Sequence, residues 1–163
     1  MSRNKTSLGN IYTNNIERSL EDNSPIKLDN SRKYYIFDII PMGAVRMSQS
    51  DRWKTNPEHK DVNKRQRSEV TRYFSFKSEL QRQAKLLNYT IYNTLDIIFC
   101  VPMPSSWSEK KKGQLIGHPV RTTPDLDNYI KAFMDALLIN DGHIWKITAE
   151  KRYAYLGSII VYQ

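Results

Sequence analysis

The chain has 163 residues and carries 25 Lys and Arg residues against 17 Asp and Glu residues, a formal net charge of +8. This length fits one domain with peripheral tails, and the basic excess favours a polyanionic partner such as nucleic acid over a merely soluble basic surface. The single cysteine, Cys100, excludes a disulfide framework within the chain and lies in an apolar run that predicts a buried thiol. No apolar stretch approaches the roughly 20 residues of a membrane span, so we expect a cytoplasmic protein without a membrane segment.

The N-terminal region differs in composition from the rest of the chain. Residues 1–30 are rich in Asn, Ser and charged side chains, which predicts a flexible N-terminal extension. The folded domain is then expected to comprise residues 31–163. Its first strand is predicted over Tyr34–Ile40, where aromatic and β-branched residues precede the turn residues Pro41-Met42-Gly43.

A long basic stretch follows this strand. Between Arg46 and Lys85 cationic residues recur with aromatic residues set among them, and the part from Ser68 to about Leu87 lacks Gly and Pro, which predicts a helix. We expect the cations to follow DNA phosphates while the aromatic rings pack in the core. The predicted DNA-binding residues are Arg46, Arg52, Lys54, Lys64, Arg65 and Arg67, together with Lys151 nearer the C-terminus.

The second half of the chain alternates strand and helix patterns. The predicted elements are a strand over Thr90–Val101, a solvated loop over Ser105–Thr123 with at most a short helical turn, a helix from Asp125 to about Leu138, and strands over His143–Tyr155 and Ser158–Tyr162. This order predicts a single α+β domain in which helices pack against a mixed β-sheet.

Two carboxylates open the predicted C-terminal helix. Asp125 lies at or near the N-cap, Asp127 lies in the first turn, and Lys131 follows one turn later on the same face as Asp127. A magnesium ion prefers hard oxygen ligands, usually one or two carboxylates with waters and substrate phosphate. The same pattern also fits ordinary helix capping and side-chain pairing, so both interpretations stand at this point.

A second acidic turn, Asn140-Asp141-Gly142, lies just beyond this helix. The ordered motifs of this region are Pro124-Asp125-Leu126-Asp127-Asn128, Lys131-Ala132, Asp135-Ala136-Leu137, Asn140-Asp141 and Lys151-Arg152-Tyr153. Together they resemble the signature of the RusA-type Holliday junction resolvases, and residues 41–46 resemble the N-terminal part of phage-borne members. The resemblance therefore implies a RusA-like fold and a phage or prophage setting.

The resemblance also assigns roles to individual residues. It implies that Asp125, Asp127 and Asp141 bind Mg²⁺ and that Lys131 is a catalytic lysine. The family's acidic pair is Asn140-Asp141 here, so Glu150 remains an alternative third ligand, and Asp135 is expected to pair or pack near Lys131.

The implied function is Mg²⁺-dependent resolution of four-way DNA junctions by paired symmetric nicks, carried out by a homodimer in DNA recombination and repair. Two alternatives remain. The chain is otherwise a less selective Mg²⁺ nuclease acting on branched DNA, or a non-catalytic basic nucleic-acid-binding module whose aspartates only cap the helix.

Overall fold

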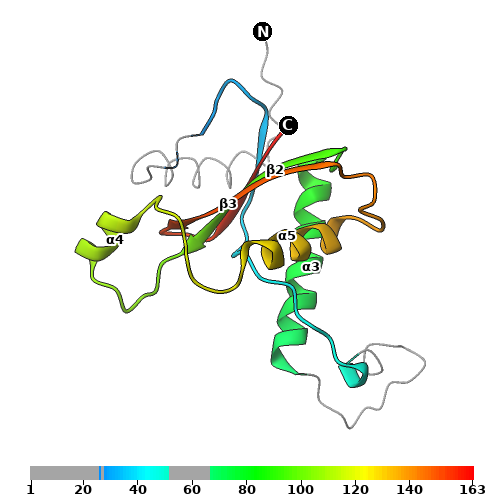
Figure 1. Ribbon diagram of the computed structural model, residues 1–163, viewed down its shortest axis with the longest axis horizontal. Coiled ribbons are helices and arrows are strands. Elements are labelled where there is room, and N and C mark those ends of the chain that lie inside the picture. The colour runs from blue at the N-terminus through cyan, green and yellow to red at the C-terminus, as the bar shows by residue number, and fades with distance from the viewer. Residues whose placement is uncertain (1–25, 27, 52–66) are drawn as a thin grey trace.

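The computed structural model describes residues 26, 28–51 and 67–163, and the elements carry the labels of Figure 1. They are β1 (Tyr34–Phe37), α3 (Ser68–Leu87), β2 (Thr94–Pro102), α4 (Glu109–Leu115), α5 (Leu126–Leu137), β3 (Lys146–Ala154) and β4 (Ser158–Tyr162). The strands form one mixed sheet that carries helices, so the predicted α+β class is confirmed. Within the described residues, no helix is long and apolar enough to cross a membrane.

The sheet has the strand order β1-β4-β2-β3. β4 pairs antiparallel with both β1 and β2, whereas β3 pairs with β2 in parallel over its whole length. The consecutive strands β3 and β4 therefore lie on opposite sides of β2 and do not form a hairpin. Their short connection contains Gly157, where a Cβ atom would lie 2.8 Å from the Cα atom of Ile40, so only glycine allows this close approach.

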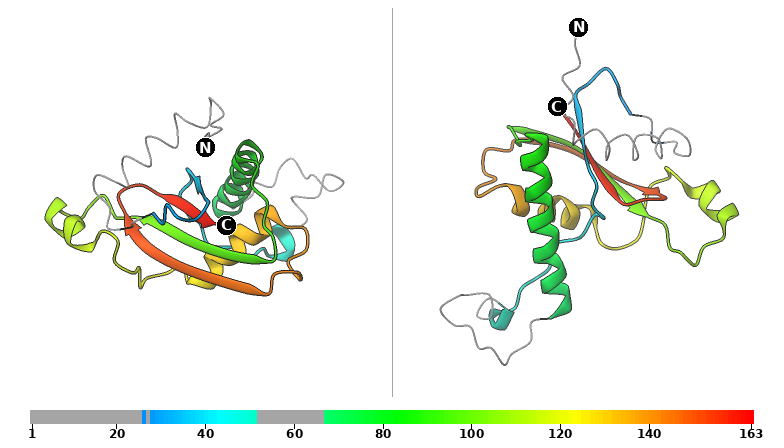
Figure 2. Two further views of the ribbon diagram at one scale, coloured as in Figure 1. Left: turned by 90° about the horizontal axis from the view of Figure 1, so that it is seen from above. Right: turned by 180° about the vertical axis from the view of Figure 1, so that it is seen from behind.

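Helices α3 and α5 cover one face of the sheet (Figures 1 and 2). Leu80 of α3 and Phe133 of α5 are fully buried there, and the rings of Phe133 and Phe37 of β1 meet edge to face with centroids 5.7 Å apart. The helix predicted over 68–87 is confirmed, and Asn88 ends it in the left-handed conformation with a φ of 50°. This shared core fixes α5, and with it the two N-terminal aspartates, against the sheet.

The opposite face of the sheet is also buried. Its second apolar cluster contains Ile26, Ile36, Ile98, Cys100, Ala154, Ile160 and Tyr162, with Leu28 packed against it. Ile26 and Leu28 come from the predicted extension, so the packed part of the chain includes these residues, while residues 1–25 lie outside the described part. The predicted burial of Cys100 is confirmed, and burial raises the pKa of its thiol to about 11.

The segment between β2 and α5 contains more helix than the sequence predicts. The short helical turn expected near Ser108 is helix α4, and the Ser108 hydroxyl accepts a hydrogen bond from the backbone N–H of Lys111. No side chain of α4 is buried, and Figures 1 and 2 show α4 apart from α3 and α5. A helix without a buried face has no periodic apolar pattern, which explains why periodicity did not predict its full length.

Candidate active site

The predicted acidic pair lies at the N-terminal end of α5. Asp125 is the N-cap residue, with extended backbone angles of φ −68° and ψ 156°, and Asp127 lies in the first turn. Both side chains are exposed, and the Asp125 carboxylate accepts no capping hydrogen bond. Within the described residues, neither carboxylate forms an ion pair. Among the described residues, the pair is therefore used neither for a side-chain helix cap at Asp125 nor for ion pairing, although the helix dipole favours negative charge at this end.

A lysine from β3 holds the turn that precedes α5. The Nζ atom of Lys151 donates hydrogen bonds to the carbonyl oxygens of Thr122 and Pro124, at 2.6 and 2.7 Å. The same ammonium lies 5.9 Å from the ring centroid of Tyr129 on α5. The peptide bond between Thr123 and Pro124 is cis. Lys151, predicted as a DNA contact, thus binds the backbone of the turn immediately before Asp125. The sequence did not predict this contact.

The segment after β1 packs against the same turn. The backbone N–H of Ala44 donates to the carbonyl oxygen of Asn128 at 3.0 Å. A Cβ atom on Gly43 would lie 2.8 Å from the Cβ atom of Pro124, so the close approach of the two segments requires glycine. Arg46 follows in this segment and is exposed. The predicted DNA contact Arg46 therefore lies in a segment that touches the start of α5.

The structure gives Arg67 a definite partner. Its guanidinium donates to both oxygens of the buried Asp51 carboxylate, with a shortest distance of 2.6 Å, and Nη2 also donates to the carbonyl oxygen of Arg46. Arg67 and then Ser48, by donating hydrogen bonds, hold the pKa of Asp51 well below its usual range. The contact ties the segment after Arg46 to the start of α3. The other predicted DNA-binding residues, Arg52, Lys54, Lys64 and Arg65, lie outside the described residues.

Lys131 and Asp135 occupy the next turns of α5. Lys131 is exposed and, among the described residues, has no ion-pair partner, so its ammonium is available to a ligand. Asp135 is predicted to pair or pack near Lys131, but it contacts α3 instead: the Tyr73 hydroxyl donates to its carboxylate at 3.4 Å. Burial first, and then the charge of Asp135, raise the pKa of Tyr73 to about 12. Asp135 thus links α5 to α3.

Asp141 lies beyond the opposite end of α5. The helix has 12 residues, and a helix of that length is about 18 Å long. Asp141 is exposed in the turn that follows, where its carbonyl oxygen accepts a hydrogen bond from the N–H of Ile144. Within the described residues, which include all three predicted ligands, no three acidic, His or Cys side chains are close enough to hold one metal ion. A single chain therefore does not group Asp141 with Asp125 and Asp127 around one metal ion.

Glu150, the alternative third ligand, is paired elsewhere. Its carboxylate accepts a hydrogen bond from Arg152 at 2.7 Å, and both side chains belong to the face of β3 opposite to that of Lys151. Because Lys151 faces the start of α5, Glu150 faces away from it. The available donor set near α5 is thus two exposed carboxylates, which fits a Mg²⁺ ion that completes its coordination with water and phosphate oxygens.

Comparison with known proteins identifies the family. Residues 43–161 match the family described as Endodeoxyribonuclease RusA. No curated protein and no solved structure matches this chain. The matched range runs from Gly43, beside Pro124, through α5 and both acidic positions into β4, so it contains every element of the candidate site. The chain belongs to the RusA endodeoxyribonuclease family.

Proposed function

We propose that this protein is a Mg²⁺-dependent crossover junction endodeoxyribonuclease that resolves four-way DNA junctions by paired symmetric nicks. The observation that carries the proposal is the pair of exposed carboxylates, Asp125 and Asp127, which have no partner among the described residues of a chain with net charge +8. Two adjacent unpaired negative charges are costly beside DNA unless a cation separates them from phosphate. Family membership supports an endonuclease acting on DNA. We propose that it acts in DNA recombination and repair, in the cytoplasm.

The residues at and around the start of α5 have distinct proposed roles in metal binding, phosphate orientation and backbone positioning. Asp125 and Asp127 would hold Mg²⁺, which when bound supplies an activated water and offsets the charge that develops on the phosphate. Lys131, one turn along the exposed face, would orient the scissile phosphate and stabilise its added charge. Lys151 and Gly43 keep the backbone of Asp125 in place. The chain's own contribution is thus a fixed acidic end of a helix with the exposed ammonium of Lys131 one turn away.

A homodimer accounts for the position of Asp141. Two α5 helices in antiparallel orientation across a two-fold axis would bring the Asp141 end of one chain to the Asp125 end of the other. The exposed apolar side chains Tyr92, Ile139 and Trp145 support an interface at the Asp141 end, with exposed fractions of 66%, 109% and 73%.

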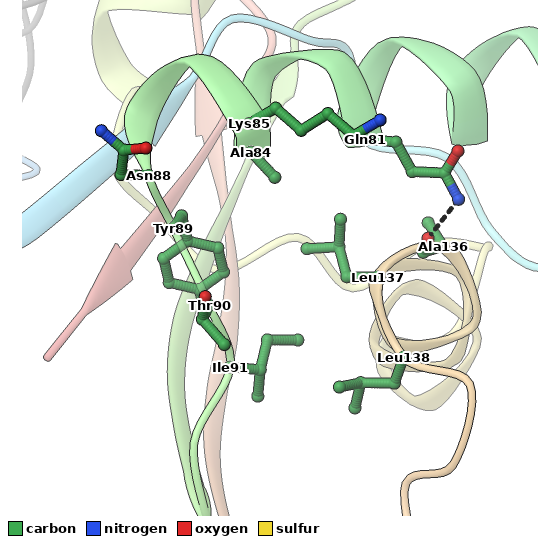
Figure 3. A pocket seen from close by; sticks show the side chains of 10 residues that line it. All are labelled: Gln81, Ala84, Lys85, Asn88, Tyr89, Thr90, Ile91, Ala136, Leu137 and Leu138. Carbon is green, nitrogen blue, oxygen red and sulfur yellow. Dashed lines mark hydrogen bonds between the residues drawn. The ribbon is translucent and has the colours of Figure 1, made fainter.

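A hollow of about 660 Å³ lies at the same end, between the ends of α3 and α5 (Figure 3). Leu137 at the end of α5 and Leu138 just after it line the hollow on one side, and Tyr89 and Ile91 line it from the segment before β2. Gln81 of α3 donates to the carbonyl oxygen of Ala136 at 2.8 Å. An open, partly apolar hollow next to exposed apolar side chains is a surface that a second chain would bury. It supports the homodimer.

The proposed activity is tested with a labelled four-way junction and the matching linear duplex, each incubated with Mg²⁺ or with a chelator. We expect paired nicks in the junction only with Mg²⁺, and nicks that ligase can seal. Equal cutting of junction and duplex would favour the less selective nuclease. DNA binding without any cutting in Mg²⁺ would favour the non-catalytic module.

The shared metal site is tested by mixing inactive variants. Asp125→Asn and Asp141→Asn chains are each expected to be inactive as homodimers. Co-expressed under different tags and purified as a heterodimer, they should recover nicking, because one of the two composite sites contains no substitution. If all ligands came from one chain, each site would carry a substitution and the heterodimer would stay inactive. Glu150→Gln is the control, and its inactivity together with an active Asp141→Asn protein would make Glu150 the third ligand.

A further inference from the structure

The segment that connects β2 to α5 has features that the acidic site does not explain. Residues 104–123, which we term the basic arm, carry three lysines and one arginine against one carboxylate. Helix α4 within it buries no side chain, and Figures 1 and 2 show it projecting away from the helices that form the core. A helix that buries nothing contributes little to the folding free energy. The conformation of the basic arm is nevertheless defined by specific contacts.

Those contacts anchor the arm and leave part of its charge exposed. The Trp107 ring packs on Tyr153 of β3 with centroids 5.4 Å apart, and the Nζ atom of Lys111 lies 3.8 Å from the Trp107 centroid. Lys112 is ion-paired with Glu109 at 2.7 Å. Lys110 is exposed and, in the part of the chain that the structure describes, has no ion-pair partner. Lys110 and Lys111 therefore present positive charge to solvent from a fixed support.

The base of the arm is continuous with the candidate active site. The N–H of Gly117 donates to the carbonyl of Tyr153, and the N–H of Val120 donates to the carbonyl of Lys151, so the returning segment pairs with β3. Arg121, also exposed, stands four residues before Asp125. Asp125 lies ten positions after Leu115, the last residue of α4. So short a segment spans at most about 33–36 Å, the length of one turn of B-DNA.

We propose that the basic arm binds the phosphates of the duplex that flanks the scissile bond, through Lys110, Lys111 and Arg121. This inference rests on the proposed function, because that function places the scissile phosphate at Asp125. A duplex leaving the start of α5 along the arm would meet these cations within one helical turn. The contacts would be to the backbone, since exposed lysines neutralise phosphates without reading bases.

The test is the salt dependence of DNA binding by the Lys110→Gln/Lys111→Gln variant of the full chain, measured in chelator by fluorescence anisotropy. Two lost phosphate contacts should lower the slope of log affinity against log salt by about 1.8, and should weaken binding by up to about 60-fold at 0.1 M salt. Because Lys110 and Lys111 are exposed and α4 has no fully buried side chain, the variant should fold like the wild type. The matched control is Lys33→Gln/Arg72→Gln, which removes the same charge from exposed positions before β1 and on α3, away from the hollow between α3 and α5.

Junction arm length supplies an independent readout. With arms of about 20 base pairs, two helical turns, the arm variant should bind more weakly than the control, and with arms of about 5 base pairs the two should be equal. An arm variant that matches the control at both lengths overturns the proposal. Wild-type cutting of the junction in Mg²⁺, assayed in parallel, reports on the proposed function separately, so the two ideas fail on different observations.

Discussion

The contact of Lys151 with the backbone before Asp125 provides the most direct test of how the site is held. Replacing Lys151 by Met keeps an unbranched apolar stem but removes the ammonium that donates to Thr122 and Pro124. Hydrogen bonds from charged groups contribute about 1.5–3 kcal/mol when buried, and these carbonyls regain water once the lysine is removed. We therefore expect a loss of about 1–3 kcal/mol in unfolding free energy, and a fall in melting temperature of about 2–4 °C for each kcal/mol.

The two possible roles of Lys151 differ in what else changes. If it positions the Asp125 turn, junction cleavage should fall about 10- to 100-fold, because small displacements of catalytic groups are that costly. Junction affinity and its salt slope should then stay the same. If Lys151 instead contacts phosphate, the slope should fall by about 0.9 while stability is kept. Lys146→Met, at the exposed start of the same strand, is the control, and a Lys151→Met protein with full activity and stability would refute the positioning role.

Three further outcomes follow from the described contacts. Arg67→Met should lower the melting temperature at neutral pH. The Arg67–Asp51 contact lowers the pKa of Asp51, so it stabilises the fold fully only above the pKa of the unfolded Asp51, near 3.9. The difference in melting temperature between the two proteins should therefore shrink as the pH falls below about 4. Gly43→Ala should destabilise the protein by about 1–3 kcal/mol and slow cleavage, because the added Cβ atom would lie 2.8 Å from the Cβ atom of Pro124. Gly113→Ala is the control: a Cβ atom there would meet no atom within 4 Å, so neither stability nor cleavage should change. The thiol of Cys100, fully buried and with a pKa raised to about 11, should react with a disulfide reagent at mild alkaline pH only after unfolding, and rapid reaction in the folded protein would contradict its burial.

Local pattern predicted helices α3 and α5 and the acidic pair, but not the full length of α4. The absence of Gly and Pro over 68–87 and the apolar repeat after Asp125 each depend on neighbours one turn apart, so they can be read without knowing the fold. Asp125 is the N-cap residue, as predicted. The capping alternative is also compatible with the sequence, and only the structure shows that the Asp125 carboxylate makes no capping hydrogen bond.

Long-range contacts were beyond the reach of the sequence pattern. The sequence around β3 does not predict that β3 pairs in parallel with β2. Nor does it predict that the Lys151 ammonium donates to the carbonyl oxygens of Thr122 and Pro124. The same holds for Ile26, whose polar surroundings in the sequence predicted an extension although its side chain packs on the sheet. Separation of Asp141 from Asp125 depends on the straightness of α5 and on the turn after it. Pairing and packing at a distance therefore account for what pattern alone did not predict.

The central position of β4 has a consequence for when the protein becomes functional during synthesis. β4 forms hydrogen bonds with both β1 and β2, so the last strand along the chain is an inner strand of the sheet. Pairings between residues far apart in sequence form slowly, and until β4 leaves the ribosome β1 has no strand partner and the edge of β2 is open to other chains. A nascent or C-terminally shortened chain thus carries the aspartates of α5 but lacks the sheet that positions them, and no competent nuclease exists before that strand is inserted.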